Sequence, residues 1–340
     1  MASEGFISKD PQIEDYWRGI ILFGRNVASY KFSLAKSLLE LNQQSGQLIK
    51  LSDLAPVFAK HICEHLKESP KQTTSASSTF LESCRRYGID GNDQGKLIEE
   101  TVKLGFNNVI DAFHVVGTGE VQKKFYIDER KQNSGIRITD EFSQLVNGVQ
   151  SSNLLVEVES RWRLVERAWE LGVSRSLIAV EHDQSNNQLF TFDSAKRRKD
   201  VTSCRSALNG YQKGKCFYCF IDIRVDDGSD VDVDHFFPDT LKKDDFKQID
   251  GVWNLVLSCV SCNRGAGGKF DKIPQINLLG RLSRRNEFLI GSNHPLRETL
   301  VSQTGTTVIE RNIFLNDFYN RAKARLFHIW EPKEQDKQFF

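Results

Sequence analysis

Apolar residues in the first part of the chain recur at steps of three and four, the period of a helix that buries one face. The stretch NVASYKFSLAKSLLELN has this spacing at Val27, Tyr30, Leu34, Leu38 and Leu41. LSDLAPVFAKHICEHLKES repeats it, with Ser52 or Asp53 as the expected N-cap and Pro56 in the first turn. Residues 1–120 are therefore predicted to form a mostly helical domain, in which the polar stretch 69–79 is a linker or mobile loop.

The middle of the chain mixes strand and helix patterns. Two β-prone runs surround KQNSG in KKFYIDERKQNSGIRITDEF, and LIAVEHDQSNNQLFTF has a similar form, so each predicts a hairpin. Between them, LLVEVESRWRLVERAWELG has helical apolar spacing and ends at Gly172, a residue type typical of helix C-termini. We expect residues 121–195 to form a mixed α/β region, and a hairpin beside helices also permits a winged-helix-like recognition module.

Near residue 230 the pattern changes to alternation with period two. In an extended segment, Asp230, Asp232 and Asp234 fall on one face, because successive side chains point to opposite sides. A row of carboxylates repels itself, so a cation is expected at this face. His235 points to the other face, and a bend that ends the strand near Pro238 would bring it toward the same site.

Composition and charge narrow the class of protein. Over 340 residues the formal net charge is +1, so any nucleic-acid surface must be a local patch. The N-terminus MASEGFISKDPQ lacks the features of a signal peptide, and no apolar run is long enough to span a bilayer. We expect a cytoplasmic protein without a membrane partner, whose seven cysteines are metal ligands or buried side chains before they are disulfides.

Four cysteines form two C-x-x-C pairs, CFYC at 216–219 and CVSC at 259–262, with 39 residues between the pairs. Two such pairs provide the four thiolates of a tetrahedral structural Zn²⁺ site. The predicted zinc ligands are Cys216, Cys219, Cys259 and Cys262. The long spacing requires a small domain between the pairs. Cys63, Cys84 and Cys204 have no such partners, and each is expected to be a small buried hydrophobe.

The stretch from Cys216 to Pro274 resembles an HNH nuclease domain of the ββα-metal type, in the form that a zinc ribbon supports. The resemblance rests on Asp-His followed by proline, a central Asn254, and a final Asn263 inside CxxCN. Its segments DVDH, LKKDD, NLVL, NRG and KIP also resemble, in order, the HNH domain of RNA-guided CRISPR nucleases. It covers roughly 60 of the 340 residues. The expected fold class is α+β, with a C-terminal ββα-metal domain after the helical and hairpin regions.

The resemblance implies roles for the polar residues of this domain. Asp234 and Asn263 would hold one hard divalent cation, Mg²⁺ or Mn²⁺, which takes few protein oxygens and keeps several waters. His235 would be the general base that takes a proton from the attacking water. Asn254 would brace the loop that carries His235. Asp232 is either a further carboxylate near the metal or a solvated side chain at the strand edge.

Basic residues close to this domain are the expected phosphate contacts. The segment from Lys196 to Lys215 carries seven basic residues and one acid, the pattern of either a solvated helix face or a nucleic-acid contact. The expected substrate-binding residues are Lys196, Arg197, Arg198, Lys199, Arg264 and Lys269, with Arg281, Arg284 and Arg285 as further sources of grip. Related domains place a basic residue closer to the final Asn, whereas GAGG separates Arg264 from Lys269. Which of these two residues contacts the phosphate is therefore left open.

The predicted domains are a helical domain at 1–120, the mixed region at 121–195, an HNH domain at 196–280 that begins with a basic helix, and a helical extension at 281–340. Together these features favour a metal-dependent HNH endonuclease acting on DNA. The first 200 residues would supply target recognition, or regulation through a protein partner. Bacterial HNH proteins of this two-part form often resemble restriction or anti-phage defence effectors, which is a family-level association only.

Two alternatives belong to other classes of function. A non-catalytic zinc-supported module could bind nucleic acid, or the helical half could make the chain an adaptor. The string HICEH at 61–65 also matches the H-x-x-E-H spacing of a family of zinc peptidases, but so short a match arises easily by chance.

Overall fold

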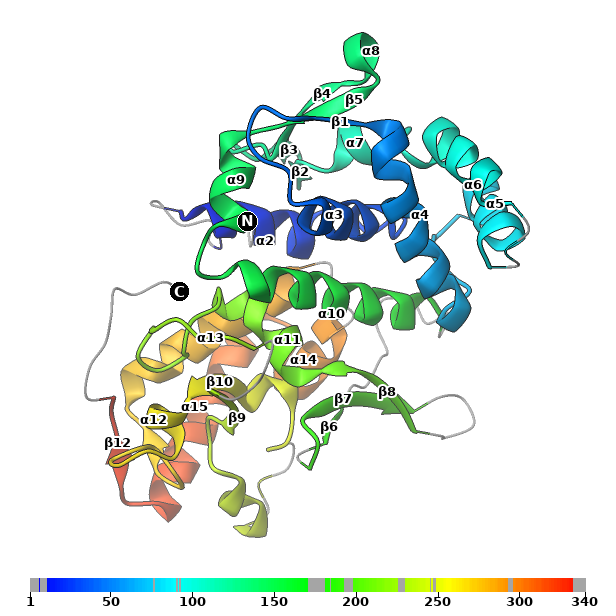
Figure 1. Cartoon of the computed structure of the whole chain (residues 1–340). Coiled ribbons are helices and arrows are strands. Elements are labelled where there is room, and N and C mark those ends of the chain that lie inside the picture. The colour runs from blue at the N-terminus through cyan, green and yellow to red at the C-terminus, as the bar shows by residue number, and fades with distance from the viewer. Residues whose placement is uncertain are drawn as a thin grey trace. The chain divides into compact units, whose positions relative to one another are not determined.

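The computed structural model describes these residues: 6, 11–75, 77–89, 91, 93–170, 181–183, 185–192, 198–225, 230–244, 246, 249–292 and 296–332. The chain divides into two compact units, one of residues Lys9–Gly172 and one that combines Met1–Ser8 with Val173–Phe340. In Figure 1 the unit Lys9–Gly172 runs from blue to green, and the part of the other unit that follows it along the chain runs from green to red. Both units combine helices with small sheets, so the predicted α+β class is confirmed at this level.

Helices dominate the unit Lys9–Gly172. Their bounds are α2 Ile13–Phe23, α3 Tyr30–Leu41, α4 Leu51–Glu68, α5 Thr79–Ser83, α6 Gln94–Glu100, α7 Val109–Ala112, α8 Arg130–Asn133, α9 Asp140–Val146 and α10 Ser151–Glu170. Two π-helical segments, η1 Cys84–Ile89 and η2 Thr101–Gly105, directly follow α5 and α6. The helical patterns at 26–42, 51–69 and 154–172 are thus confirmed as α3, α4 and α10 over their described residues.

The start of α4 differs from the prediction. The helix begins at Leu51, directly after a strand, so neither Ser52 nor Asp53 is its N-cap. The amide of Leu51 instead donates to the carbonyl oxygen of Ser134 at 2.9 Å. A backbone carbonyl from the residue between α8 and β5 therefore replaces the side-chain cap that the local sequence suggested.

A three-stranded antiparallel sheet in the order β1-β5-β4 accompanies these helices. Strands β4 Tyr126–Glu129 and β5 Gly135–Ile138 form the predicted hairpin, with α8 as its connection, and β1 Leu48–Lys50 pairs with β5. A short second ladder joins β2 Val115–Val116 to β3 Gly119–Glu120. Because β1 and β5 lie on either side of residue 120 and pair, the predicted boundary there falls inside one unit.

Aromatic side chains form the core of this unit. Trp17 of α2 packs edge-on against Phe113 and Phe125, with ring centroids 5.7 and 5.1 Å apart. Trp162 of α10 is fully buried and donates to Gln72 Oε1 at 2.9 Å. Gln72, which is also fully buried, belongs to the stretch 69–79, so part of this expected linker packs against the core instead.

The second unit places small sheets before and among its helices. Its strands are β6 Glu181–Asp183, β7 Gln188–Phe192, β8 Arg198–Ser203, β9 Val231–His235, β10 Leu255–Cys259, β11 Ile273–Pro274 and β12 Ile329–Trp330. Its helices are α11 Cys204–Asn209, α12 Val260–Asn263, α13 Ile276–Gly291, α14 Leu296–Thr304 and α15 Val308–Arg325, with the 3-10 turns η3 Gly210–Gln212, η4 Asp239–Asp244 and η5 Val252–Asn254. The strands pair as β6-β7-β8, β9-β10 and β11-β12.

Three predictions are changed by this unit. The second hairpin is confirmed as β6 with β7, but it lies in a different unit from β4 and β5, which removes the support for one recognition module at 121–195. The basic segment 196–215 was expected to be a helix, yet Arg198–Ser203 is strand β8, because main-chain pairing with β7 outweighs local helix propensity there. Its next part, Cys204–Asn209, is the helix α11. Helix α13 runs across the predicted boundary at 280.

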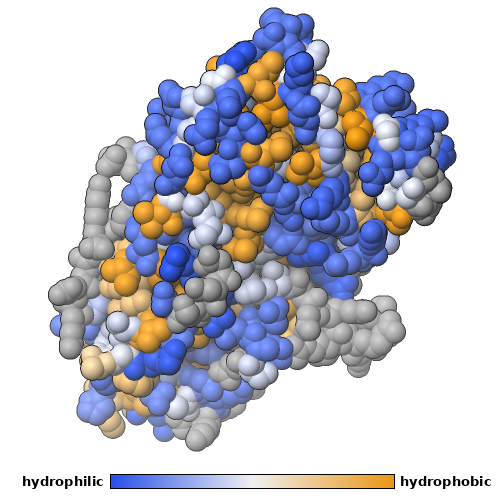
Figure 2. Space-filling view, viewed as in Figure 1, coloured by the Kyte–Doolittle hydropathy of each residue, from blue (hydrophilic) through white to orange (hydrophobic). Residues whose placement is uncertain are grey.

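Hydrophilic residues cover much of the face seen in Figure 2, with apolar residues interspersed. Scattered exposed apolar side chains such as Val149 and Phe327 are ordinary for a protein surface. In the part of the chain that the structure describes, no helix has the length and apolar character needed to cross a bilayer.

Candidate metal centres

The four cysteines predicted to bind zinc lie together. Their Sγ atoms are all within 4.8 Å of one another, and all four side chains are buried. Tetrahedral Zn²⁺ with Zn–S bonds of about 2.3 Å holds its sulfurs about 3.8 Å apart. The Sγ atoms of Cys219 and Cys259 are 3.8 Å apart. The donor set therefore fits a structural zinc ion, whose charge would offset that of the thiolates.

Backbone geometry positions these sulfurs. In the first pair, Phe220 has a positive φ of 65°, and its amide donates to the carbonyl of Cys216 at 3.0 Å, which closes a tight turn. The amide of Phe217 donates to Leu257 of β10 at 2.9 Å, which docks this turn on the hairpin. In the second pair, Cys259 is the last residue of β10 and the N-cap of α12, and its amide donates to Cys216 Sγ at 3.3 Å.

Two arginines that were expected to grip DNA support this framework instead. Arg281 Nη1 donates to the carbonyls of Phe217 and Tyr218 at 2.6 and 2.7 Å, and burial lowers the pKa of Arg281 to about 10. Arg285 is fully buried and donates to the carbonyl of Trp253 at 3.2 Å. Positions four apart share one helix face, and in α13 that face is the core. Arg284 is exposed.

A strand, strand, helix sequence carries the second group of candidate residues. β9 and β10 pair antiparallel, with Asp234 opposite Val256 and His235 opposite Leu255, and α12 follows directly. Asp232 and Asp234 share one face of β9, as the alternation predicted. His235 is the last residue of β9, so the strand ends where the expected general base lies.

Asp234 is buried and has two partners. Tyr218 donates to its Oδ2 at 2.6 Å, and Lys269 Nζ lies 3.2 Å from its Oδ1. Burial raises the pKa of Asp234, and Lys269 and Tyr218 partly offset that effect. Lys269 was expected to reach a phosphate, but its side chain is fully buried. The ammonium is drawn to the carboxylate because a buried charge is costly unless paired.

Asp232 of β9 accepts hydrogen bonds from residues at the end of α12. Asn263, the last residue of α12, donates to Asp232 Oδ2 at 3.1 Å, and Arg264 Nε lies 2.8 Å from the same oxygen. Of the two environments considered for Asp232, the structure shows a partnered carboxylate beside Asn263. The hydrogen bond of Asn263 thus goes to Asp232, while Asp234 has other partners. Arg264 remains 60% exposed and accessible to a phosphate.

Asn254 holds the backbone on both sides of the loop that follows His235. Its Nδ2 donates to the carbonyls of Phe237 and Ile249 at 3.0 and 2.8 Å, and its Oδ1 accepts from the amide of Phe237 at 2.8 Å. The side chain is fully buried. This is the geometry that a brace for the loop requires.

Two neighbours of the site were missed in the sequence, Tyr218 and Asp250. His235 Nε2 lies 3.5 Å from Asp250 Oδ1, and Lys242 Nζ donates to Asp250 Oδ2 at 2.6 Å. His235, Asp239 and Asp250 place ligand atoms within 4.8 Å of one another. Asp250 comes from the turn before η5, and no local pattern indicates that this turn folds back onto the end of β9.

The basic residues before the domain are only partly described. Lys196 and Arg197 lie outside the described residues. For Arg198 and Lys199 the structure gives the backbone, in the edge strand β8. Their role as phosphate contacts stays a prediction.

The HICEH string does not form a metal site in the described part of the chain. His61 Nε2 contacts Glu40 at 3.0 Å, whereas His65 contacts Glu159 and Glu166 at 3.1 and 2.7 Å. Burial alone would lower the pKa of His65, but the hydrogen bonds to these two carboxylates raise it. Each histidine therefore has its own carboxylate partners.

The candidate site thus combines the hairpin β9-β10, the helix α12 and the turn before η5, and the four-cysteine cluster adjoins it through Cys259, between β10 and α12. Comparison of the chain with protein-family models, with curated proteins and with solved structures finds no match.

Proposed function

We propose that the chain is a metal-dependent endonuclease of the HNH type, which hydrolyses phosphodiester bonds in DNA. The observation that carries the proposal is the hairpin β9-β10 with α12, which gathers Asp232, Asp234 and Asn263 and ends its first strand at His235. The cysteine cluster supports the same unit, since Cys259 is both the last residue of β10 and the N-cap of α12.

The oxygen atoms near this hairpin suit a hard divalent cation. Asp234 and Asn263 would hold Mg²⁺ or Mn²⁺, and Asp232 is a third oxygen source beside them. When bound, the cation would neutralise charge that develops on the phosphate. Lys269 and Arg264 compensate the carboxylates in this structure, so positive charge is favoured at this face.

His235 would take the proton from the water that attacks the phosphorus atom. Asn254 fixes the backbone of the following loop, and Asp250 faces Nε2 of the ring. A carboxylate beside one ring nitrogen orients the imidazole and favours one tautomer, which leaves the other nitrogen to accept a proton. We therefore propose His235 as the base and Asp250 as a residue that positions it.

Most of the affinity for DNA must come from residues outside the HNH segment. Residues 213–274 carry nine basic and eleven acidic residues, so this segment has no net positive charge to attract phosphates. Reversing Lys196, Arg197, Arg198 and Lys199 to glutamate should weaken DNA binding strongly. It should also reduce the magnitude of the slope of log affinity against log salt concentration by roughly three to four. The reason is that four fewer phosphates are neutralised, so fewer counterions are released on binding. Fluorescence anisotropy with labelled duplex DNA at several salt concentrations measures both effects.

A control with the same change in charge should use four exposed lysines in the other unit, Lys50, Lys71, Lys103 and Lys131. Equal losses in the two variants would show that the segment 196–199 acts only through net charge. Unchanged affinity and slope would make it a solvated surface.

The alternative is a zinc-supported module that binds nucleic acid, or an adaptor, without catalysis. One observation favours it: Asp234 is already balanced by Lys269. Purified chain that binds plasmid DNA in Mg²⁺ or Mn²⁺ without cutting it would support this alternative. Metal-dependent cutting would support the nuclease, and its role as a restriction or anti-phage effector would then be a question for cells challenged with phage.

A further inference from the structure

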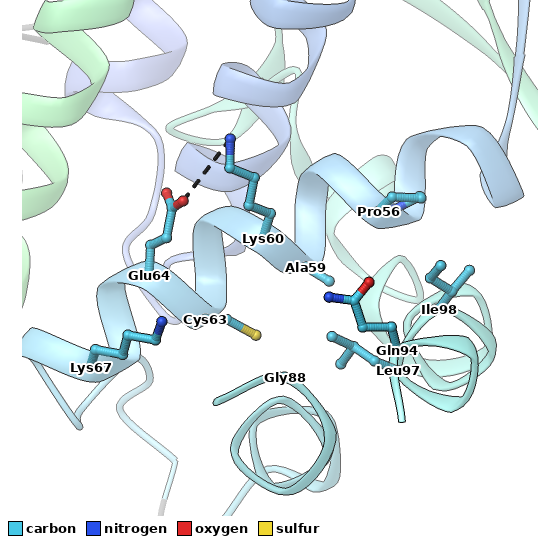
Figure 3. Close-up of a pocket in the computed structure, with 10 residues that line it drawn as sticks. All are labelled: Pro56, Ala59, Lys60, Cys63, Glu64, Lys67, Gly88, Gln94, Leu97 and Ile98. Carbon is cyan, nitrogen blue, oxygen red and sulfur yellow. Dashed lines mark ion pairs between the residues drawn. The ribbon is translucent and has the colours of Figure 1, made fainter. Parts of the chain in front are cut away.

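A cavity of about 330 Å³ lies in the unit Lys9–Gly172, between α4, η1 and α6. Its volume is at the lower end of the range of small-molecule sites. Apolar groups of Ala59, Leu97 and Ile98 line it together with charged residues of α4 (Figure 3). It is formed entirely by the helical unit, so it is separate from the candidate metal centres.

The thiol of Cys63 projects from α4 into this cavity, toward the segment that carries Gly88 (Figure 3). The side chain is 7% exposed. A Cβ atom at Gly88 would lie 2.3 Å from Cys63 Sγ, which is impossible without a shift. The absence of a side chain at position 88 therefore leaves room for the sulfur. The residue lies in a π-helical segment, a form that often marks functional positions.

A second thiol lies behind the first. Cys63 Sγ donates to the carbonyl oxygen of Cys84 at 3.7 Å, and Cys84 is fully buried. Interaction with Cys84 lowers the pKa of Cys63, against the opposing effect of burial, and interaction with Cys63 raises the pKa of Cys84. The thiol that faces the cavity is thus the better nucleophile of the two.

Charged side chains of both signs lie at the cavity beside Cys63. Lys60 and Lys67 are both on α4 with Cys63, and Lys60 is 4.0 Å from Glu64. Lys67 contributes to the lowered pKa of Cys63, and the charge of Glu64 opposes this effect. Reactive cysteines often lie beside a basic residue and beside a second cysteine that resolves the first product, and Lys67 and Cys84 provide these two features here.

We propose that Cys63 is a peroxide-reactive thiol in a preformed cavity and that Cys84 resolves its oxidised form. The Cys63 thiolate attacks one oxygen of a hydroperoxide; an S–O bond forms, the O–O bond breaks, and the alkoxide or hydroxide leaves and takes up a proton. The sulfur of Cys84 then attacks Cys63; an S–S bond forms, the S–O bond breaks, and hydroxide leaves as water with the proton of Cys84. Overall, the two thiols lose two electrons to form a disulfide. An organic hydroperoxide is reduced to its alcohol and one water, and hydrogen peroxide is reduced to two waters.

The test exposes the full-length protein to hydrogen peroxide, followed by alkylation and peptide mass spectrometry, which reads each cysteine separately from the zinc-site cysteines. Cys204 is the matched control, because it is fully buried and desolvation raises its pKa to about 12. We expect a peptide pair linked through Cys63 and Cys84, formed at least about tenfold faster than any oxidation of Cys204.

Two variants separate the steps. In Cys84→Ser, dimedone should label Cys63 as a sulfenic acid, because the resolving thiol is gone. When Gly88→Ala is added to Cys84→Ser, with folding checked by circular dichroism, labelling of Cys63 should fall because the new methyl group crowds the sulfur. Equal oxidation rates at Cys63 and Cys204, or absence of both the linked peptides and the dimedone adduct, would overturn the proposal.

Discussion

His235→Ala should abolish cleavage of DNA while leaving the fold, the zinc content and DNA affinity close to those of the wild type. A general base acts in the transition state, so its loss lowers the turnover rate by roughly a hundredfold to ten-thousandfold with little effect on binding. The side chain lies at the end of β9 and is not part of the hydrogen-bonded brace that Asn254 provides. Conversion of supercoiled plasmid to nicked and linear forms measures the rate.

Two further variants distinguish the role of His235 as general base from the roles of a positioning residue and a metal ligand. Asp250→Asn should lower the rate less than His235→Ala does, because it removes only the partner of the ring. Asp234→Ala should also abolish cleavage, but by loss of a metal ligand, so excess Mn²⁺ should restore part of its activity and none of that of His235→Ala. Cleavage by His235→Ala at the wild-type rate would refute the proposed role of this residue.

Cys259→Ser should disrupt the unit that holds the hairpin, and the wild-type chain should contain about one zinc ion. Structural zinc contributes an apparent 10–16 kcal/mol or so in zinc-finger peptides, which exceeds or matches the stability of about 5–15 kcal/mol typical of domains. Cys259 ends β10 and is the first residue beside α12, so loss of its sulfur affects both elements. Elemental analysis gives the zinc content, and hydrogen exchange reports which segments lose protection.

Cys204→Ala is the matched control, since Cys204 is a buried thiol outside the cluster. It should keep its zinc and the protection of β9 and β10. A wild-type chain that contains no zinc and still has a protected hairpin would contradict the zinc assignment. So would a Cys259→Ser variant that keeps both zinc and protection.

The parts of the structure that sequence could predict are those set by local periodicity or by a few strong ligands. Helical spacing located α3, α4 and α10, and period-two alternation placed Asp232 and Asp234 on one face of β9. The two C-x-x-C pairs indicated the cysteine cluster, because four sulfurs in that arrangement have few other uses in a chain of this kind.

The parts that sequence could not predict depend on contacts between distant segments. Lys269, Arg281 and Arg285 are cations that sequence alone assigns to the surface, yet each is buried against a specific acceptor. Part of the basic segment, Arg198–Ser203, is strand β8 because β7 pairs with it. Asp250 lies 15 residues after His235 and reaches it only through the fold of the intervening loop.

The most direct test of the central claim is plasmid cleavage by the purified wild-type chain with Mg²⁺ present or omitted, with zinc content measured in both samples. Omission is preferable to a strong chelator, because the latter could also remove structural zinc. The proposed mechanism predicts cleavage that requires Mg²⁺ or Mn²⁺ while the zinc content stays constant. Equal cleavage with and without the added metal, or DNA binding with no cleavage in either metal, would contradict it.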